Sequence, residues 1–378
     1  MNKKRIEYLD YAKAFAIISV LLNHSAIEFK GMNCFTMAVF FISSGYTYNS
    51  DQDSFGVCLS KKFKRLLIPF FAAMAVSALL EVVRGTFIGY GSIKSAIPVI
   101  ANMFYGSGLF PNVGSLGRYL IDIPPFALNT KYMIDIIMPT NCQLWALPVM
   151  FSGYMIFYLY RKLLKNRNIL TDVAAILVFL LLTSIETIPG IFQLPFGIGR
   201  GFICAAFMIV GYWFKEYKVL EDSNIIRVIA IMLLSTMIAV ASILLGSDVT
   251  GMVISTYGPY GIWSIAITFL CGVCSAYVVF MICRFIHSLS FAPVNNLFAF
   301  IGRNTMEVFL WHFVVFFIFD VVFISIFNPV LSINQFYDEL FSEGYIVYRV
   351  LRIILTIICL SQIGEFKLRS KFRKASNS

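Results

Sequence analysis

The stretch IIRVIAIMLLSTMIAVASILL, residues 225–245, contains a single charged side chain, Arg227. A run of about 20 apolar residues is long enough to cross the roughly 30 Å hydrocarbon core of a bilayer as one helix. Similar runs recur along the chain, in which 59% of the 378 residues are hydrophobic and only 13% are charged. Because a water-soluble fold could not bury so much apolar surface, the sequence predicts an all-α polytopic membrane protein.

About ten transmembrane helices are expected. The runs cover residues 10–28, 32–48, 66–81, 143–160, 169–184, 192–214, 225–245, 261–285, 297–319 and 345–363. The basic segment 61–65 resembles an interfacial amphipathic helix that leads into the third run. The longest connection, between the third and fourth runs, is expected on the outer side. We expect one transmembrane domain over residues 1–378, with no cleaved signal peptide and no separate soluble domain.

The distribution of charge predicts the topology. The chain has 30 Lys and Arg against 20 Asp and Glu, a formal net charge of +10. The basic residues lie in short clusters between alternate runs, whereas the connections 244–260 and 321–344 contain none. By the positive-inside rule, both termini are expected to be cytoplasmic. We expect a multi-pass protein of the cell inner (plasma) membrane. This pattern does not indicate a nucleic-acid partner.

Cysteine and glycine patterns point to helix packing. Cys271 and Cys274 lie within one apolar run, where thiols behave as small hydrophobic side chains. Gly197, Gly199 and Gly201 match neither phosphate-binding spacing, and small residues allow helices to approach closely. The three histidines and eight cysteines show no zinc-type spacing, so no metal site is expected.

The first run contains most of the candidate chemistry. At about 100° per residue, Asp10, Lys13, His24 and Glu28 share one broad face of a helix. Ionisable groups in a span are costly and therefore suggest function. Lys13 could hold an anionic donor at the inner mouth, with His24 as a general base or acyl-accepting nucleophile. Alternatively, Asp10 and Lys13 form an anchoring ion pair and His24 joins helices by a hydrogen bond.

Three arginines near the outer ends of other runs are further candidates. Arg200 lies at the start of the sixth run, and Arg349 and Arg352 share a face of the tenth. Each could hold an anionic or sugar-rich substrate, or it could extend to lipid phosphates. The pattern leaves both interpretations open.

Five segments, in order along the chain, resemble the acyltransferase-3 family of membrane proteins. They are IEYLDYAK at 6–13 leading to NH at 23–24, FFISSGY at 40–46, LWAL at 144–147, GR at 199–200 with GY at 211–212, and IGRNT at 301–305 leading to His312. In that family a basic residue precedes a catalytic histidine by eleven positions, as Lys13 precedes His24. The resemblance covers nearly the whole chain.

The resemblance implies an O-acyltransferase, usually an O-acetyltransferase that uses cytoplasmic acetyl-CoA. The acceptor would be a hydroxyl of a sugar, a polysaccharide or a lipid-linked glycan, and His24 would be the catalytic base or acyl acceptor. The residues implied to contact substrate are Asp10, Lys13, Ser44, Trp145, Arg200, Arg303, Asn304 and His312. Acyl-CoA is a donor substrate rather than a resident cofactor, and the expected partners are acyl-CoA, a glycan acceptor and membrane lipid.

Departures from the family pattern concern mainly the acceptor. Thr36 and Ala38 stand where sugar-acetylating members often carry His and Pro, and Ala146 replaces an aromatic residue. Lys13 replaces the commoner Arg, which keeps the charge but loses the bidentate fork. Since no hydrolase-like domain is expected, the membrane domain or a separate partner would complete the transfer.

Two other functions fit a polytopic protein with charges in its spans. A transporter or flippase of a glycan or lipid-linked substrate would also use many spans and kinked helices. Such proteins often repeat a pair of broken helices in two halves, and no such repeat is found here. A catalytically inactive structural subunit is the third interpretation.

Overall fold

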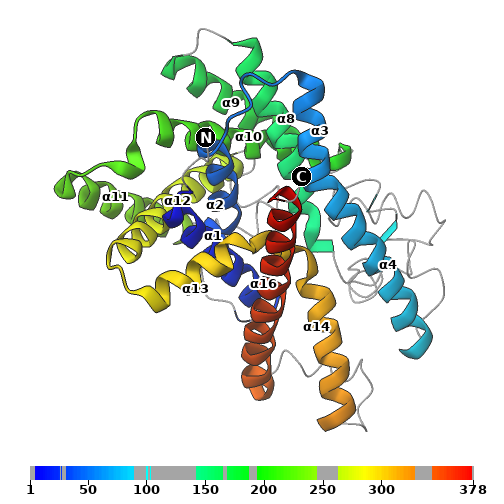
Figure 1. Cartoon of the computed structure of the whole chain (residues 1–378). Coiled ribbons are helices and arrows are strands. Elements are labelled where there is room, and N and C mark those ends of the chain that lie inside the picture. The colour runs from blue at the N-terminus through cyan, green and yellow to red at the C-terminus, as the bar shows by residue number, and fades with distance from the viewer. Residues whose placement is uncertain are drawn as a thin grey trace.

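A computed structural model describes residues 5–25, 27, 31–88, 99–100, 103, 142–164, 168–186, 194–244, 263–327 and 343–376. Within these ranges every regular element is helical (Figure 1). Six helical segments among them are long and apolar enough to cross a membrane: Phe55–Leu80, Pro195–Glu216, Ile225–Leu244, Trp263–Ser288, Thr305–Ile326 and Ile346–Lys367. The chain is thus a helical polytopic protein, while the ten spans and the side of the termini stay predictions.

Two short helices occupy the middle of the fold. They are α1 (Glu7–Asn23) and α2 (Asn33–Tyr46), and both contact α12 (Trp263–Ser288). Helix α1 is apolar on nearly every side, which is the pattern of a helix enclosed by others. It ends at Asn23, earlier than the predicted 28, and Glu28 lies outside the described residues.

Helix α2 crosses α10 (Ile198–Glu216) so closely that the backbones of the two helices are in contact. A Cβ added to Gly45 would meet the carbonyl of Met208, and one added to Gly211 would meet the carbonyl of Ile42. Each helix therefore supplies a glycine to the same crossing. The family-like pairs Ser44-Gly45 and Gly211-Tyr212 thus join two central helices.

The glycines around Arg200 confirm the prediction of close packing. Gly201 packs against Gly153 of α8 (Ala146–Leu163), where an added Cβ would lie 3.0 Å from the Gly153 nitrogen. Gly197 has a positive φ of 59° and begins α10. Cys271 likewise packs between helices, because its thiol lies 3.9 Å from the Ala239 carbonyl of α11 (Ile225–Leu244).

The third predicted span begins earlier than expected. Helix α3 (Phe55–Lys62) continues through the π-turn Phe63–Leu67 into α4 (Ile68–Ile88). Pro69 has no N–H to donate to the Arg65 carbonyl, and a π-turn is a common way to accommodate such a loss. The basic segment is therefore part of one long helical segment rather than a separate interfacial helix.

The predicted ninth span, 297–319, is wrong as a single helix. The structure has α13 (Ala292–Arg303) and α14 (Thr305–Phe327), separated at Asn304. The Asn304 side-chain amide donates to the Phe300 carbonyl at 2.8 Å, and the Asn304 backbone N–H turns to the Ile301 carbonyl at 3.0 Å. This side chain takes the place of the helical backbone hydrogen bond and ends α13.

Helix α14 packs lengthwise against α16 (Ile346–Ser376), with α4 on its other side (Figure 1). Helix α9 (Ile169–Glu186) packs on α10. Glu365 of α16 pairs with Arg303, the last residue of α13. The neighbouring Gly302 touches Asp10, near the beginning of α1. The beginning of α1 and the last turns of α16 therefore lie at the same end of the fold.

Gly45→Ala and Gly211→Ala are each expected to destabilise the protein by about 1–3 kcal/mol, because the added methyl group meets a backbone carbonyl. The measurement is the thermal midpoint for loss of the monodisperse peak in detergent. Gly56→Ala is the control, since no atom lies within 4 Å of its added Cβ. Equal midpoints for the Gly45 and Gly56 variants would contradict the close crossing.

Candidate functional site: a basic cavity and a histidine pair

A cavity of about 870 Å³ opens among α1, α2, the π-turn, α8, α10 and the α13–α14 joint. We call it the basic cavity, because six basic and two acidic side chains line it. These are Arg5, Lys13, Lys62, Arg65, Lys215 and Arg303, with Asp10 and Glu221. Such an excess of positive charge favours an anionic ligand, and guanidinium and ammonium groups are the usual partners of phosphate.

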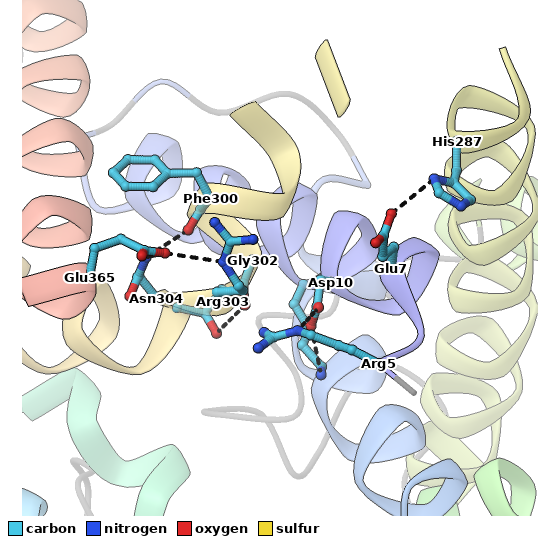
Figure 2. Close-up of polar contacts among 11 residues, drawn as sticks. Arg5, Glu7, Asp10, His287, Phe300, Gly302, Arg303, Asn304 and Glu365 are labelled. Atoms are coloured by element: carbon cyan, nitrogen blue, oxygen red, sulfur yellow. Dashed lines mark hydrogen bonds and ion pairs between the residues drawn. The ribbon is translucent and has the colours of Figure 1, made fainter. Parts of the chain in front are cut away.

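Asp10 organises the α1 wall of the basic cavity. Its carboxylate is buried and accepts from Arg5 and from Lys13, the latter at 3.5 Å (Figure 2). The ion pair of the anchoring alternative is therefore present, and both partners also line the cavity. Lys13 keeps about a quarter of its side chain exposed, enough to reach a ligand.

The α13–α14 joint forms another wall. Gly302 packs on the Asp10 carbonyl, where any larger residue would collide with the α1 backbone. Arg303 lines the cavity and bonds to Glu365 of α16 at 3.1 Å (Figure 2). Asn304 is buried beneath it and also reaches Glu365, at 3.4 Å. Asn304 therefore shapes the joint, and the described cavity lining does not include it.

The loop between α2 and α3 forms the rim of the cavity. The Asp51 carboxylate accepts from Nε and Nη2 of Arg161, at 3.0 and 2.6 Å, and the Asp51 carbonyl accepts from Lys162 at 2.6 Å. Asp53 pairs with Lys61 at 2.8 Å, and this hydrogen bond lowers the pKa of the Asp53 carboxyl. Basic residues that the sequence analysis used only for topology thus hold this loop to α8 and α3.

The α2 wall connects polar groups across the cavity. Ser44 lines it, although its hydroxyl donates to the Phe40 carbonyl at 2.9 Å. Tyr46 donates to Glu221 at 3.0 Å and lies 3.2 Å from the Tyr8 hydroxyl. Lys62 lies 3.4 Å from the centroid of the Tyr154 ring, a cation–π contact.

Phe309 is the residue furthest along α14 that lines the basic cavity, and we call this position its apolar end. The histidine pair lies beyond it on the same helix. The Phe309 ring centroid is 6.2 Å from that of His312, which is completely buried. His312 Nε2 is 2.9 Å from His24 Nδ1, and the two ring planes are nearly parallel, 14° apart, with their centroids separated by 5.1 Å. His24 is only partly buried, so it retains surface for a substrate.

A second buried cluster holds the chain directly after His24. Arg352 forms a two-oxygen ion pair with Asp320 at 2.8 and 2.9 Å, and both side chains are at most 3% exposed. Arg352 also donates to the Ser25 hydroxyl at 3.3 Å, and Arg349 donates to the Ser25 carbonyl at 3.2 Å. Arg352 is thus an internal ion-pair partner, which neither sequence interpretation anticipated.

Arg200 and Trp145 form a third group beside the cavity. The Arg200 guanidinium lies 5.8 Å from the centroid of the Trp145 ring, and only 7% of Arg200 is exposed. Trp145 precedes Ala146, which lines the cavity. The chain before Arg200 is bent, because Phe196 has a φ of 56° and its carbonyl accepts from Ser152 at 2.8 Å.

The predicted site residues therefore fall into several groups. Asp10, Lys13, Ser44 and Arg303 meet at the basic cavity. His24 and His312 contact each other beyond the apolar end of the cavity. Asn304 forms the joint between α13 and α14. Arg200 and Trp145 contact each other beside the cavity. The sequence analysis missed the cavity residues Arg5, Lys62, Arg65, Lys215 and Glu221. It also missed Asp320, although a lone carboxylate in an apolar run is a recognisable signal.

The fold and site define a polytopic helical membrane protein that has a basic cavity next to a pair of hydrogen-bonded histidines. The family described as acyltransferase domain, acyltransferase 3, matches residues 6–361. The chain therefore belongs to the acyltransferase 3 family, which indicates a membrane acyltransferase, and the resemblance is confirmed. Comparisons with curated proteins and with solved structures gave no significant match.

Asp320→Asn is expected to destabilise the protein by about 3–5 kcal/mol, because it leaves the Arg352 charge buried without its partner. The thermal midpoint in detergent measures the loss, and the double variant Asp320→Leu with Arg352→Leu should recover much of it. Asp222→Asn is the control, since its partner Arg227 is 63% exposed. An Asp320→Asn midpoint equal to that of the control would refute the role of the pair.

Proposed function

We propose that the protein is an O-acyltransferase that moves an acetyl group from cytoplasmic acetyl-CoA to a hydroxyl of a sugar, polysaccharide or lipid-linked glycan. The observation that carries the proposal is a continuous series of contacts from the basic cavity through Phe309 and His312 to His24. The series joins a site suited to an anionic donor to a group able to take a proton. Family membership supports the same reaction class.

The donor binds with its phosphates in the basic cavity. Coenzyme A carries several phosphate charges at one end and a long, thin arm that ends in the thioester. The residues that line the cavity include the basic Lys62, Arg65 and Arg303 and the apolar Met37 and Phe309. His24 lies eleven residues beyond Lys13 on α1, about 16 Å along the axis, a distance that the donor arm would span once Phe309 moves aside.

The reaction needs one proton acceptor near the thioester. His24 takes the proton of the acceptor hydroxyl, and the oxygen forms a bond to the thioester carbon as the C–S bond breaks. The sulfur leaves as the thiolate of coenzyme A and takes the proton back from the His24 imidazolium. In the covalent variant, the acyl group is first carried on the His24 ring before it passes to the hydroxyl.

The other expected residues support the two substrates. Lys13 and Asp10 hold the donor end, and Ser44 offers a polar group on the α2 wall. Trp145 and Arg200 are both buried next to Ala146, so in this proposal they support the cavity wall at Ala146 rather than touch a sugar directly. The end of the fold shared by the start of α1 and the last turns of α16 faces the cytoplasm of a plasma (inner) membrane, so the acceptor approaches from the opposite side.

His24→Ala is expected to lower acetyl transfer by about 100- to 10,000-fold, because the transfer loses its proton acceptor. The assay measures thiol release from acetyl-CoA in proteoliposomes and the acyl content of host glycans by mass spectrometry. His287→Ala is the matched control, since His287 is 39% exposed and contacts Glu7 rather than the pair. Equal activity of the His24 and His287 variants would refute the proposal.

Lys62→Gln and Arg65→Gln are each expected to raise the KM for acetyl-CoA by about tenfold with kcat nearly unchanged, because each removes a charge from the donor site. Steady-state kinetics at low and high salt measure the effect, which should shrink as salt rises. Lys64→Gln is the control, because this neighbouring side chain is exposed and the cavity lining does not include it. The donor site is wrong if all three variants behave alike.

A further inference from the structure

The hydrogen bonds of His312 determine where its proton lies. His312 Nδ1 is 2.8 Å from the Phe309 carbonyl and 3.2 Å from the Val308 carbonyl, both on its own helix α14. A carbonyl oxygen can only accept, so Nδ1 of His312 is the nitrogen that carries the hydrogen. The ring is completely buried beside Phe309, Phe313 and Phe316, where a charged imidazolium is costly. His312 is therefore neutral, and its Nε2 is bare.

The bare Nε2 of His312 then determines the state of His24. It is 2.9 Å from His24 Nδ1, and a bare nitrogen can only accept. His24 Nδ1 must carry the hydrogen, which leaves the lone pair of His24 on Nε2. None of the residues that the structure describes forms a hydrogen bond with this Nε2, and His24 is partly exposed.

We propose that His312 is a positioning residue that holds His24 in the Nδ1–H tautomer and so presents the His24 Nε2 lone pair to the substrate. The inference deepens the proposed function and rests on the catalytic role of His24. It replaces the expectation that His312 contacts substrate. Fixing the tautomer and orientation of a catalytic imidazole is the task that the carboxylate performs in a Ser-His-Asp triad.

Neighbouring contacts hold the two rings in this arrangement. Phe313 stacks on His24 at 5.0 Å and packs against His312 at 4.2 Å. Ser25, directly after His24, is held by Arg349 and Arg352 through its carbonyl and hydroxyl. The His24 ring is thus supported by α14 on one side and by α16 through the next residue.

Nitrogen-15 NMR of histidine-labelled full-length protein reads the tautomers directly, because the chain has only three histidines. His287→Gln removes the third signal and leaves the pair unchanged. At neutral pH both remaining histidines are expected to show a protonated Nδ1 and a bare Nε2. A hydrogen on Nε2 of His24 in the His287→Gln variant would overturn the proposal.

Two substitutions at His312 distinguish the effect of its hydrogen bond to His24 from the effect of its ring on packing. His312→Gln keeps an oxygen acceptor where Nε2 lies, whereas His312→Phe keeps the ring without any hydrogen bond. In His312→Phe, His24 should shift toward the Nε2–H tautomer and kcat should fall by at least about tenfold, with the KM for acetyl-CoA within about twofold. In His312→Gln, the tautomer is kept and most of kcat returns.

The possible results distinguish this inference from the proposed function. An unchanged tautomer and kcat in His312→Phe would overturn the positioning role, even if His24→Ala is inactive. The expected tautomers together with an active His24→Ala variant would overturn the catalytic role of His24 but keep the tautomer assignment. If His312→Phe does not fold, the spectra of the parent and of His312→Gln still decide the assignment.

Discussion

The contact between the α13–α14 joint and the backbone of α1 is the constraint on which the site depends. Gly302 lets the joint press on the Asp10 carbonyl, and Asn304 ends α13 so that α14 can leave in its own direction. His312 lies seven residues beyond Thr305, the first residue of α14, about 10 Å along the axis of that helix. A shift of α14 by one residue would rotate His312 by about 100° and remove it from His24. One small residue therefore sets the register of both histidines.

The same joint couples the basic cavity to the histidine pair. Arg303, next to Gly302, faces the cavity and is held by Glu365 of α16. Phe309, about one turn into α14, lines the cavity, and its carbonyl accepts a hydrogen bond from His312. A movement of α14 that opened the apolar end at Phe309 would also move the acceptor that orients His24. In the proposed mechanism, entry of the donor and orientation of His24 would therefore depend on the same helix.

Much of the fold followed from the sequence, because apolar length and glycine spacing are local properties. The family, the helical membrane class and the packing role of Gly201 were predicted correctly. The division of α13 from α14 was not predicted, since the hydropathy pattern runs on through Asn304 and only its side-chain hydrogen bond ends the helix. The basic cavity was also missed. Lys13 and Arg303 were predicted as substrate contacts. The other basic residues of the cavity come from distant segments, where the positive-inside rule already accounted for their charge: Arg5, Lys62, Arg65 and Lys215.

A histidine suits the partner position of His24 better than a carboxylate would in this setting. A carboxylate at position 312 would bring an additional negative charge into a buried region, at a cost of several kcal/mol unless it were paired. The Arg352 guanidinium nearby is already neutralised by Asp320 and so is committed to that pair. His312 accepts the same hydrogen bond without a charge, and its own hydrogen is satisfied by backbone carbonyls of α14. The neutral pair can therefore orient a base inside the membrane domain at lower electrostatic cost, with Asp320 and Arg352 left to hold the neighbouring chain.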